Sequence, residues 1–305
     1  MSYQIQEINR RIQADPKEFV DACDAAYAEK IERAARAIAE NVRTCPIVLL
    51  SGPSGSGKTT TAMKIAEALR GMGISSQSLA MDDYFRTVNP RTAPRTPEGD
   101  IDFESPACLD MDLLGKHLNA LARGEEIHLP RYNFVTRVQS GPIGRPMRLG
   151  KDEVVVCEGI HALNDDIAAY CPDAFRLYIS ARSVVVDGDG QEIFKGTWMR
   201  LLRRLVRDSN FRGTPAAATL DMWANVRRGE KRFISPFKER ANLMFDSSFP
   251  CEVSIMKNFA APLLAAVPEG AERYAEIRSI LPALERFETI DPTPVSYTHL
   301  TLPTT

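Results

Sequence analysis

Apolar residues recur at helical spacing through a charged, alanine-rich segment near the start of the chain. The residues on the shared face are Val20, Cys23, Tyr27, Ile31, Ala34 and Ile38. Because residues three and four positions apart lie on one side of an α-helix, this spacing predicts a long amphipathic helix over about residues 17–42. The helix precedes the first predicted strand and carries no obvious catalytic chemistry.

Four short stretches after this helix predict strands. Two of them, PIVLL and VVVC, are apolar without alternation, as in strands buried on both faces of a parallel sheet. The four predicted strands are residues 46–50, 77–81, 154–157 and 175–179. Helical segments lie between them, one with Ala62, Ile65, Ala66 and Leu69 on one face and one over residues 110–123. Strands that alternate with helices predict a doubly wound α/β sheet.

The second half of the chain has weaker patterns. The stretch SVVVDGDGQEIF predicts a hairpin or loop around Asp187 and Gly188, where a plain turn is favoured over a metal site. Residues 197–241 are rich in helix formers and arginine, and residues 252–256 are expected to form a last strand. No internal repeat is evident in the sequence.

Composition narrows the function classes. The net charge of -2 gives no broad attraction to nucleic acid or to an anionic membrane, so we expect neither as a partner. No apolar run approaches the roughly 20 residues that span a bilayer, and the first residues lack an apolar signal core, so we expect a cytoplasmic protein. The 6 cysteines show no C-x-x-C pairing, which favours reduced, mostly buried thiols. A homo-oligomer is left open.

The last stretch, DPTPVSYTHLTLPTT, breaks the pattern with three prolines, few charges and no periodicity. Its final part, VSYTHLTLPTT, resembles translated cloning or sequencing-adapter read-through. We therefore expect residues 291–305 to be an unstructured tail of doubtful native origin. If that interpretation is right, the natural C-terminus is missing.

A glycine-rich motif, GPSGSGKT at residues 52–59, stands between the first predicted strand and the helix after it. It matches G-x-x-x-x-G-K-[ST], whose backbone N–H groups and following helix N-terminus bind phosphate. Lys58 would reach the β- and γ-phosphates, and the Thr59 hydroxyl would bind Mg²⁺. The predicted nucleotide-binding residues are Gly52, Ser54, Gly55, Ser56, Gly57, Lys58, Thr59 and Thr60. The sequence has no N-K-x-D motif to read guanine, so ATP is the expected nucleotide.

Acidic residues follow two predicted strands, at the edge where an open α/β sheet collects its chemistry. Asp82, with Asp83 beside it, could accept a hydroxyl proton and help to hold Mg²⁺; the alternative is a helix cap or turn. Glu158 ends a buried strand and is a candidate for a magnesium contact, with a buried salt bridge as the alternative. His161 could touch substrate or metal, although a packed or solvent-facing histidine fits the pattern equally well.

Arginines cluster in the helical segment that follows. They are Arg200, Arg203, Arg204 and Arg207, with Arg212 just beyond. Several share one helix face, where guanidinium groups could neutralise a transferring phosphoryl group; the alternative is a solvated face paired with acids. The absence of interleaved aromatic residues counts against a nucleic-acid patch. A second basic group fits a solvated face and consists of Arg227, Arg228, Lys231 and Arg232.

Taken in order, these motifs resemble those of the uridine kinase and phosphoribulokinase family of P-loop kinases. The resemblance covers about residues 46–258. The motifs that carry it are GPSGSGKTT, MDDYF, DFESPACLD, LPRYNF, VVVCEGI and RRLVRDSNFRG. The W-x-x-V-R-R-G-E stretch at Trp223 and the PFKERANLMFDSS stretch look like a bacterial branch often labelled nucleoside kinase.

The resemblance implies that ATP gives its γ-phosphoryl group to a primary hydroxyl. It implies that Asp82 is the catalytic base and that Thr59 and Glu158 contact magnesium, with Asp82 helping to hold it. A mobile lid over the phosphates would consist of Arg204, Arg207 and Arg212. Tyr132 would lie against the nucleoside base, and the remaining acceptor-binding candidates are Asp83, Tyr84, Glu104, Arg137 and His161.

Three positions depart from the family pattern. Glu104 stands where uridine kinases place an aspartate that holds the sugar hydroxyls, and Arg137 stands where they place a histidine near the pyrimidine. Thr214 replaces a second lid arginine after Arg212. The resemblance therefore implies that the core phosphate machinery is present, beside an altered acceptor pocket and a slightly altered lid.

The sequence thus predicts a kinase that uses ATP and Mg²⁺ and acts on the 5′-hydroxyl of a nucleoside such as uridine or cytidine. Arg137 favours an alternative, anionic acceptor such as a sugar phosphate or a pantothenate-like alcohol. A hypothesis from another class is a regulatory protein that uses ATP as a switch. The predicted organisation is an N-terminal helical extension over residues 1–45, a P-loop kinase domain with an arginine-bearing helical lid over residues 46–290, and the tail.

Overall fold

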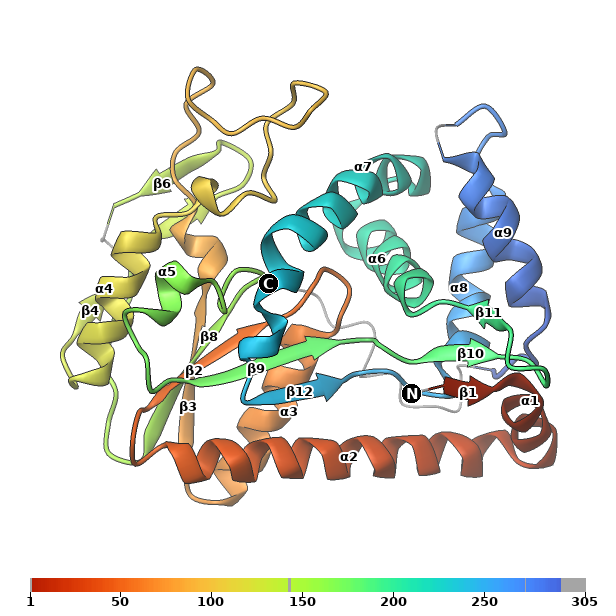
Figure 1. The fold of residues 1–305 in the computed structure, drawn as a ribbon, viewed down its shortest axis with the longest axis horizontal. Coiled ribbons are helices and arrows are strands. Elements are labelled where there is room, and N and C mark those ends of the chain that lie inside the picture. The colour runs from red at the N-terminus through yellow and green to blue at the C-terminus, as the bar shows by residue number, and fades with distance from the viewer. Residues whose placement is uncertain (1, 142–143, 272, 292–305) are drawn as a thin grey trace.

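A parallel sheet forms the centre of the computed structural model, which describes residues 2–141, 144–271 and 273–291 (Figure 1). Each pair of neighbouring strands in the sheet is parallel. The strand order is β12 (Leu243–Asp246), β9 (Phe175–Ser180), β2 (Ile47–Ser51), β8 (Glu153–Glu158) and β3 (Ser75–Ala80). The predicted α/β sheet is confirmed, and the four predicted strands lie within one or two residues of the observed ones.

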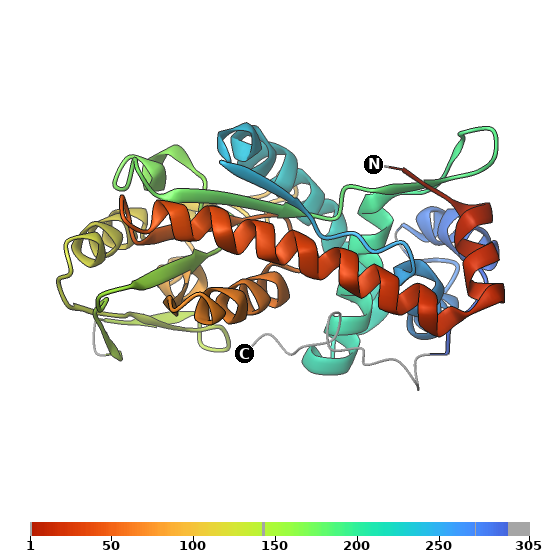
Figure 2. The same ribbon diagram turned by 90° about the horizontal axis from the view of Figure 1, so that it is seen from below.

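Both faces of this sheet are buried, which explains its apolar strands. On β2, Ile47 and Leu49 belong to one core cluster while Val48 and Leu50 belong to another, as the alternation of a strand requires. The helices α2 (Pro16–Asn41) and α3 (Lys58–Gly71) contribute to the cluster of Val48. The helices α4 (Met111–Ala122) and α5 (Asp165–Ala168) contribute to the cluster of Ile47 (Figure 2).

The helix α2 confirms the long amphipathic helix predicted near the start of the chain. Asp15 caps it by accepting a hydrogen bond from the Glu18 backbone N–H at 2.9 Å, and Pro16 occupies the first helical position. Its buried face carries the residues that the spacing selected. Tyr27, Ile31 and later residues pack on the sheet, so this helix shares a core with the central strands. The predicted boundary near residue 45 stays a prediction.

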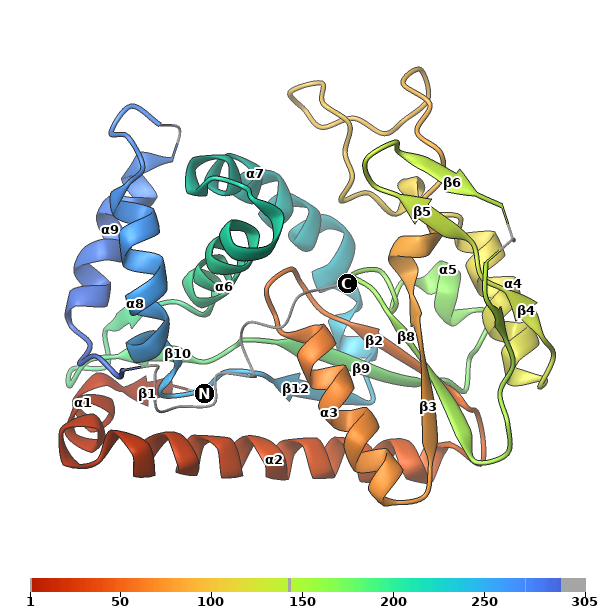
Figure 3. The ribbon, with the colours of Figure 1, turned by 180° about the vertical axis from the view of Figure 1, so that it is seen from behind.

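A helical lobe lies on the opposite side of the molecule from α4 and α5 (Figures 1 and 3). Its core encloses Trp223, which is 1% exposed, and also takes in the first turns of α2. The helices of this lobe are α1 (Ile5–Ala14), α6 (Gly196–Arg212), α7 (Ala216–Gly229), α8 (Glu252–Ala265) and α9 (Tyr274–Glu285). A small sheet of β1 (Ser2–Gln4), β10 (Val184–Val186) and β11 (Glu192–Phe194) completes it. The β10–β11 pair confirms the hairpin predicted around Asp187.

Two expectations about strands are wrong. Residues 252–256 begin α8, and the last strand of the central sheet is β12 instead. A run of five residues such as EVSIM does not distinguish a strand from a buried helix, and here the apolar character continues to Ala265. The strand β1, which pairs with β10, also precedes the strand that the sequence pattern placed first.

Smaller elements complete the fold on the side of α4. Two short antiparallel pairs are β4 (Ile127–His128) with β7 (Pro146–Met147), and β5 (Arg131–Asn133) with β6 (Val138–Ser140). A 3₁₀ turn spans Met81–Tyr84. After α7, a π-helical turn (Glu230–Ile234) leads into a further 3₁₀ turn (Ser235–Arg240).

The cysteines and the tail can be compared with their predictions directly. All six cysteines are buried and free, as predicted. Within the described ranges, no helix is both long and apolar enough to cross a bilayer. Residues 292–305, nearly all of the predicted tail, lie outside the described residues.

Candidate active site

Three neighbouring strands end side by side, and this register assembles the site. Glu158 at the end of β8 pairs with Leu50 of β2 on one side and with Ala80 of β3 on the other. The glycine loop follows β2 directly, and Asp82 follows β3 within the 3₁₀ turn. The two candidate acids and the loop therefore meet at one edge of the sheet, as the sequence predicted.

The loop glycines are required by conformation and by close packing. Gly55 and Gly57 have φ values of 73° and 79°, in the left-handed region that favours glycine, and Gly57 caps α3. A Cβ atom on Gly52 would lie 2.0 Å from the carbonyl oxygen of Ile179, and one on Gly55 would lie 2.5 Å from that of Arg200. The loop is thus pressed between the end of β9 and α6.

A cavity of about 350 Å³ opens at this loop. Basic side chains outnumber carboxylates in its lining, with five against two, so it suits a polyanion. The loop contributes Ser54, Gly55, Ser56, Gly57, Lys58, Thr59 and Thr60; the charged residues beyond it are Asp82, Glu158, Arg203, Arg204, Arg207 and Arg212. Gly52, the remaining predicted nucleotide-binding residue, packs against β9 rather than lining the cavity.

The oxygen donors at this edge suit a magnesium ion. The Thr59 hydroxyl donates a hydrogen bond to Glu158 Oε1 at 2.8 Å, so these two predicted magnesium contacts already touch. Asp82 lines the same cavity. Mg²⁺ prefers oxygen ligands and commonly takes only one or two carboxylates, filling its other positions with water and phosphate oxygens. The residues present therefore fit this ion.

The cradle also fits a phosphate. The Ser56 side chain is fully buried, and no described residue lies within hydrogen-bond distance of its hydroxyl. Buried hydroxyl groups normally have a partner, so this orphaned group in the phosphate loop marks a place for a polar ligand. Lys58, two positions further on, donates a long hydrogen bond to the Pro53 carbonyl, at 3.4 Å.

Burial shifts the pKa values of the two central charged groups in opposite directions. It lowers the pKa of Lys58, against the raising effect of Glu158 and Asp82. It raises the pKa of Asp82, against the lowering effect of Lys58 and Arg212. A carboxylate with a raised pKa accepts a proton more readily, which suits a general base.

The predicted lid arginines converge on one acid that the motif analysis did not select. Asp208 is 1% exposed. Its Oδ1 accepts hydrogen bonds from Arg207 at 2.9 and 2.8 Å, and it forms ion pairs with Arg204 at 3.2 Å and Arg212 at 3.5 Å. Arg204 also reaches the loop, donating to Ser54 Oγ at 3.0 Å. An acid four residues from two arginines was the available signal for Asp208.

The other two arginines of α6 lie inside the protein rather than on a solvated face. Arg200 pairs in bidentate fashion with Glu230, and Arg203 does so with Glu252. Both arginines are less than a tenth exposed. Arg203 also lines the cavity, although the sequence did not single it out from its neighbours.

The second basic group is only partly the solvated face that the sequence suggested. Arg228 forms an ion pair with the buried Asp102 at 2.9 Å, and Arg227 contacts Glu230. Lys231 and Arg232 are exposed, in agreement with the prediction. The Arg228–Asp102 pair connects α7 to the loop that carries the acceptor candidate Glu104.

Glu104 lies under the helical lobe, where charged residues of the phosphate cavity act on its carboxyl group. The backbone of Gly229 approaches so closely that a Cβ there would lie 2.4 Å from Glu104 Cβ. Burial raises the pKa of Glu104 to about 7, opposed by Arg204 and Lys58 and assisted by Asp102. Arg204 and Lys58 also line the phosphate cavity, which links the two regions electrostatically.

The other acceptor candidates surround this region without lining the phosphate cavity. Tyr132 is 6% exposed, and no described residue bonds its hydroxyl; Asp83 accepts a hydrogen bond from its backbone. Burial lowers the pKa of His161 to about 4, which keeps the ring neutral near pH 7. The Arg137 guanidinium lies 5.4 Å from the Phe103 ring centre.

Tyr84 is placed differently from the other candidates. Its side chain is fully buried in the core under α4, and its hydroxyl lies 2.8 Å from His117 Nδ1. The 3₁₀ turn points Asp82 to the cavity and Tyr84, two positions on, to the core. The structure therefore gives Tyr84 a packing role.

A phosphate loop after the central strand of a parallel α/β sheet, with carboxylates at the ends of the next two strands on one side, defines a P-loop phosphotransferase. The model of the phosphoribulokinase / uridine kinase family matches residues 47–253, more than half of the chain. The chain belongs to this family.

Two curated relatives agree with this assignment. A uridine kinase of Deinococcus deserti is 31% identical over 199 residues, covering 65% of this chain and 86% of the relative. A uridine kinase of Staphylococcus haemolyticus is 28% identical over 210 residues, covering 68% of this chain and 91% of the relative. A solved structure described as a possible uridine kinase, from Bacillus stearothermophilus, is 19% identical with a TM-score of 0.45. The match covers 72% of this chain and 98% of that structure.

Proposed function

We propose that this protein is an ATP- and Mg²⁺-dependent kinase that phosphorylates the 5′-hydroxyl of a nucleoside such as uridine or cytidine. The observation that carries the proposal is the meeting of Asp82 and Glu158 with Lys58 and Thr59 in one positively charged cavity. Relatives of the chain that are named uridine kinases support the nucleoside as acceptor.

In this proposal the phosphate end of the site works mainly by positioning and electrostatics. The loop N–H groups and Lys58 bind the phosphates of ATP, and Thr59, Asp82 and Glu158 hold Mg²⁺. When bound, ATP supplies the phosphoryl group, and Mg²⁺ neutralises charge on the phosphate oxygens. Asp82 accepts the proton of the acceptor hydroxyl, for which its raised pKa suits it.

The arginines of α6 form the cationic side of the same site. Arg204, Arg207 and Arg212 stabilise negative charge on the transferring group, because their forked donors match phosphoryl oxygens. Asp208 holds their guanidinium groups together at 3.5 Å or less. Without this buried acid, three like charges on one helix would repel one another.

The acceptor end is assigned to the residues around Glu104. Glu104 binds the sugar hydroxyls, and Tyr132 packs against the base with Asp83 and His161 nearby. Arg137, at the tip of the β5–β6 hairpin, discriminates among acceptors. A guanidinium at this tip suits an anionic acceptor better than a pyrimidine ring, so the acceptor panel must include both kinds.

The test is release of ADP from Mg-ATP by the purified chain across nucleosides, sugar phosphates and pantothenate-like alcohols, with Lys58→Ala as the blank. We expect a nucleoside to stimulate release at least tenfold over the rate without acceptor. Preferential stimulation by an anionic alcohol would replace the nucleoside as the substrate class. Slow ATP hydrolysis unaffected by every acceptor, together with nucleotide-dependent partner binding, would favour a switch protein instead.

A further inference from the structure

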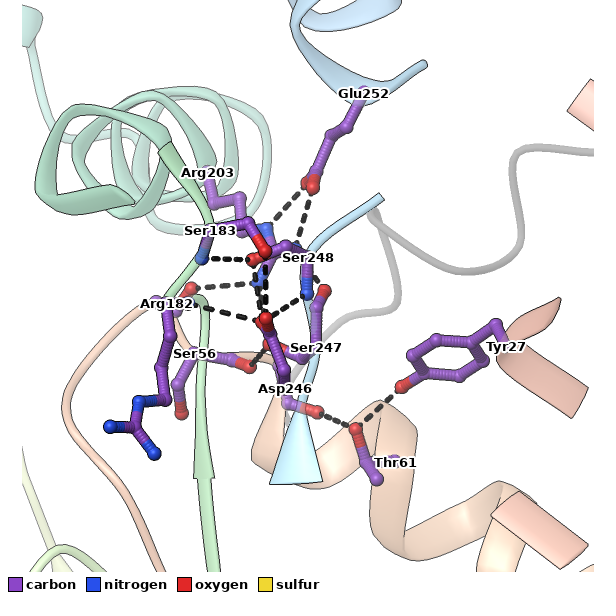
Figure 4. Close-up of polar contacts among 12 residues, drawn as sticks. Tyr27, Ser56, Thr61, Arg182, Ser183, Arg203, Asp246, Ser247, Ser248 and Glu252 are labelled. Carbon is purple, nitrogen blue, oxygen red and sulfur yellow. Dashed lines mark hydrogen bonds and ion pairs between the residues drawn. The ribbon is translucent and has the colours of Figure 1, made fainter. Parts of the chain in front are cut away.

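Three consecutive carbonyl groups of the phosphate loop are each bound by a side chain. The Gly55 carbonyl accepts from Arg203 Nη1 at 3.2 Å, and the Ser56 carbonyl accepts from Ser247 Oγ at 2.6 Å (Figure 4). The Gly57 carbonyl accepts from Thr61 Oγ1 at 2.8 Å. Two of these three donors come from elements far from the loop in sequence, α6 and the segment after β12.

Every N–H donor of the Arg203 side chain is engaged in a hydrogen bond. Its Nε and Nη2 bond the two carboxylate oxygens of Glu252, and Nη2 also bonds the Ser247 carbonyl at 2.8 Å. Its Nη1 bonds the Gly55 carbonyl and, at 3.4 Å, Ser247 Oγ. A guanidinium has five N–H donors in one plane, and these contacts account for all five. The arginine is 7% exposed and Glu252 is 1% exposed, so water does not compete for these bonds.

The side chain that binds the Gly57 carbonyl is itself held by a residue of α2. Thr61 donates its only hydroxyl proton to Gly57, so Tyr27 must be the donor in the 2.7 Å contact between Tyr27 OH and Thr61 Oγ1. Tyr27 is 5% exposed and stacks on Phe249, with ring centres 4.5 Å apart. Tyr27 lies on α2, outside the residues 47–253 that the family model matches.

Because of the geometry of the peptide group, these contacts at the carbonyls also orient N–H groups of the loop. In a planar trans peptide, the carbonyl of one residue and the N–H of the next point in opposite directions. Fixing the Ser56 and Gly57 carbonyls therefore fixes the N–H groups of Gly57 and Lys58. Both residues line the phosphate cavity, so these are N–H groups that a bound phosphate would meet.

We propose that Arg203, Ser247, Glu252, Thr61 and Tyr27, the loop-support cluster, position the phosphate loop for nucleotide binding. These are positioning residues, because their hydrogen bonds lead to the loop carbonyls, although Tyr27, Arg203 and Ser247 also line the cavity. The cluster also joins the loop to α6, which carries the site arginines, and to α2. This inference rests on the proposed function for the identity of the ligand.

Neighbouring serines provide a matched test. Ser247 and Ser248 are both buried, but the hydrogen bonds of Ser248 Oγ go to Asp246, at 2.6 Å, and to the Ser183 backbone N–H rather than to the loop. We expect Ser247→Ala to weaken Mg-ATP binding about 3- to 10-fold, the loss typical of one buried hydrogen bond. We expect Ser248→Ala to lower the melting temperature but to change Mg-ATP affinity less than about twofold. Isothermal titration calorimetry and thermal melts of both variants measure the two effects.

A second, more conservative variant keeps the inference testable if Ser247→Ala does not fold. Tyr27→Phe removes one hydroxyl oxygen, keeps the aromatic stack and should also weaken Mg-ATP binding several-fold. Equal Mg-ATP affinity of Ser247→Ala, Tyr27→Phe and the wild type would overturn the inference. Wild-type binding of Mg-ATP without transfer to any acceptor would overturn only the proposed function, because binding alone reports on the loop. Failure of the wild type to bind Mg-ATP would overturn both.

Discussion

Adjacent residues on one helix have different roles in this protein. Arg203 is buried against Glu252 and supports the phosphate loop, whereas Arg204 contacts Ser54 and Asp208 beside the cavity. The sequence grouped them because both belong to one arginine run. It could not separate them, since the partner Glu252 comes from a segment far along the chain whose secondary structure was itself mispredicted. The loop residues were predictable because their chemistry depends on local spacing alone.

The pKa of Glu104 leads to a prediction at the residue scale. In the folded protein this carboxyl keeps its proton up to about pH 7, whereas its ordinary pKa is 4.5. A group that binds its proton more tightly in the folded state loses stabilising free energy as the pH rises between these values. Glu104→Gln mimics the protonated form. It should therefore raise the melting temperature more at pH 8 than at pH 5, by about 2–4 °C for each kcal/mol of this difference.

Thermal melts at both pH values measure this difference, with the exposed Glu98→Gln as the control. The control should change the melting temperature equally at pH 5 and pH 8. If Glu104→Gln behaved like Glu98→Gln, burial of the Glu104 carboxyl would not govern its charge. The same variant should also weaken acceptor binding above pH 7, since an amide offers sugar hydroxyls one neutral accepting oxygen where a carboxylate offers two charged ones.

At the scale of elements, α6 is organised around a buried acid. Asp208 accepts hydrogen bonds from Arg207 and forms ion pairs with Arg204 and Arg212. Because Asp208 is only 1% exposed, water does not screen those contacts. Sequence spacing placed the arginines on one face but could not show that an acid within the same run gathers them. The strand β12 and the helix α8 were missed for a related reason, because short apolar stretches fit either structure until their packing is known.

Asp208→Asn should disorganise the arginines without removing any of them. We expect the free energy of unfolding to fall by about 1–3 kcal/mol, as for a buried polar group that loses its partners. We expect turnover to fall roughly 10- to 100-fold, because misplaced groups cost catalysis steeply. Chemical denaturation and steady-state kinetics measure the two effects, with the exposed Asp221→Asn of α7 as the matched control. Unchanged turnover in Asp208→Asn would show that the arginines need no organising acid.

At the scale of the whole molecule, α2 joins the two parts of the fold. Phe19, Val20 and Cys23 pack in the helical lobe, and the buried residues from Tyr27 to Ile38 pack on the central sheet. Figure 1 shows α2 running along both parts. The sequence predicted the helix and its buried face but not its partners, since an amphipathic pattern shows that a face is buried and not against what. The parallel sheet and the cluster of loop, Asp82 and Glu158 were predictable, because parallel strands end at a common edge.

The whole arrangement is that of an enzyme that moves a phosphoryl group from a nucleotide to an acceptor. In the proposed reaction, Asp82 takes the proton of an acceptor hydroxyl beside a phosphate bound at Lys58. Replacing Asp82 by asparagine keeps the shape of the side chain and removes its basicity, so nucleotide binding should persist while transfer falls about 10²- to 10⁴-fold.

The most direct measurement is ³¹P nuclear magnetic resonance of the products formed from Mg-ATP and uridine by the wild type and by Asp82→Asn. We expect the wild type to give a nucleoside 5′-monophosphate resonance that grows in step with ADP. We expect Asp82→Asn to leave ATP intact. Inorganic phosphate as the only product of the wild type would contradict transfer to a nucleoside, and full monophosphate formation by Asp82→Asn would contradict the role of Asp82 as the base.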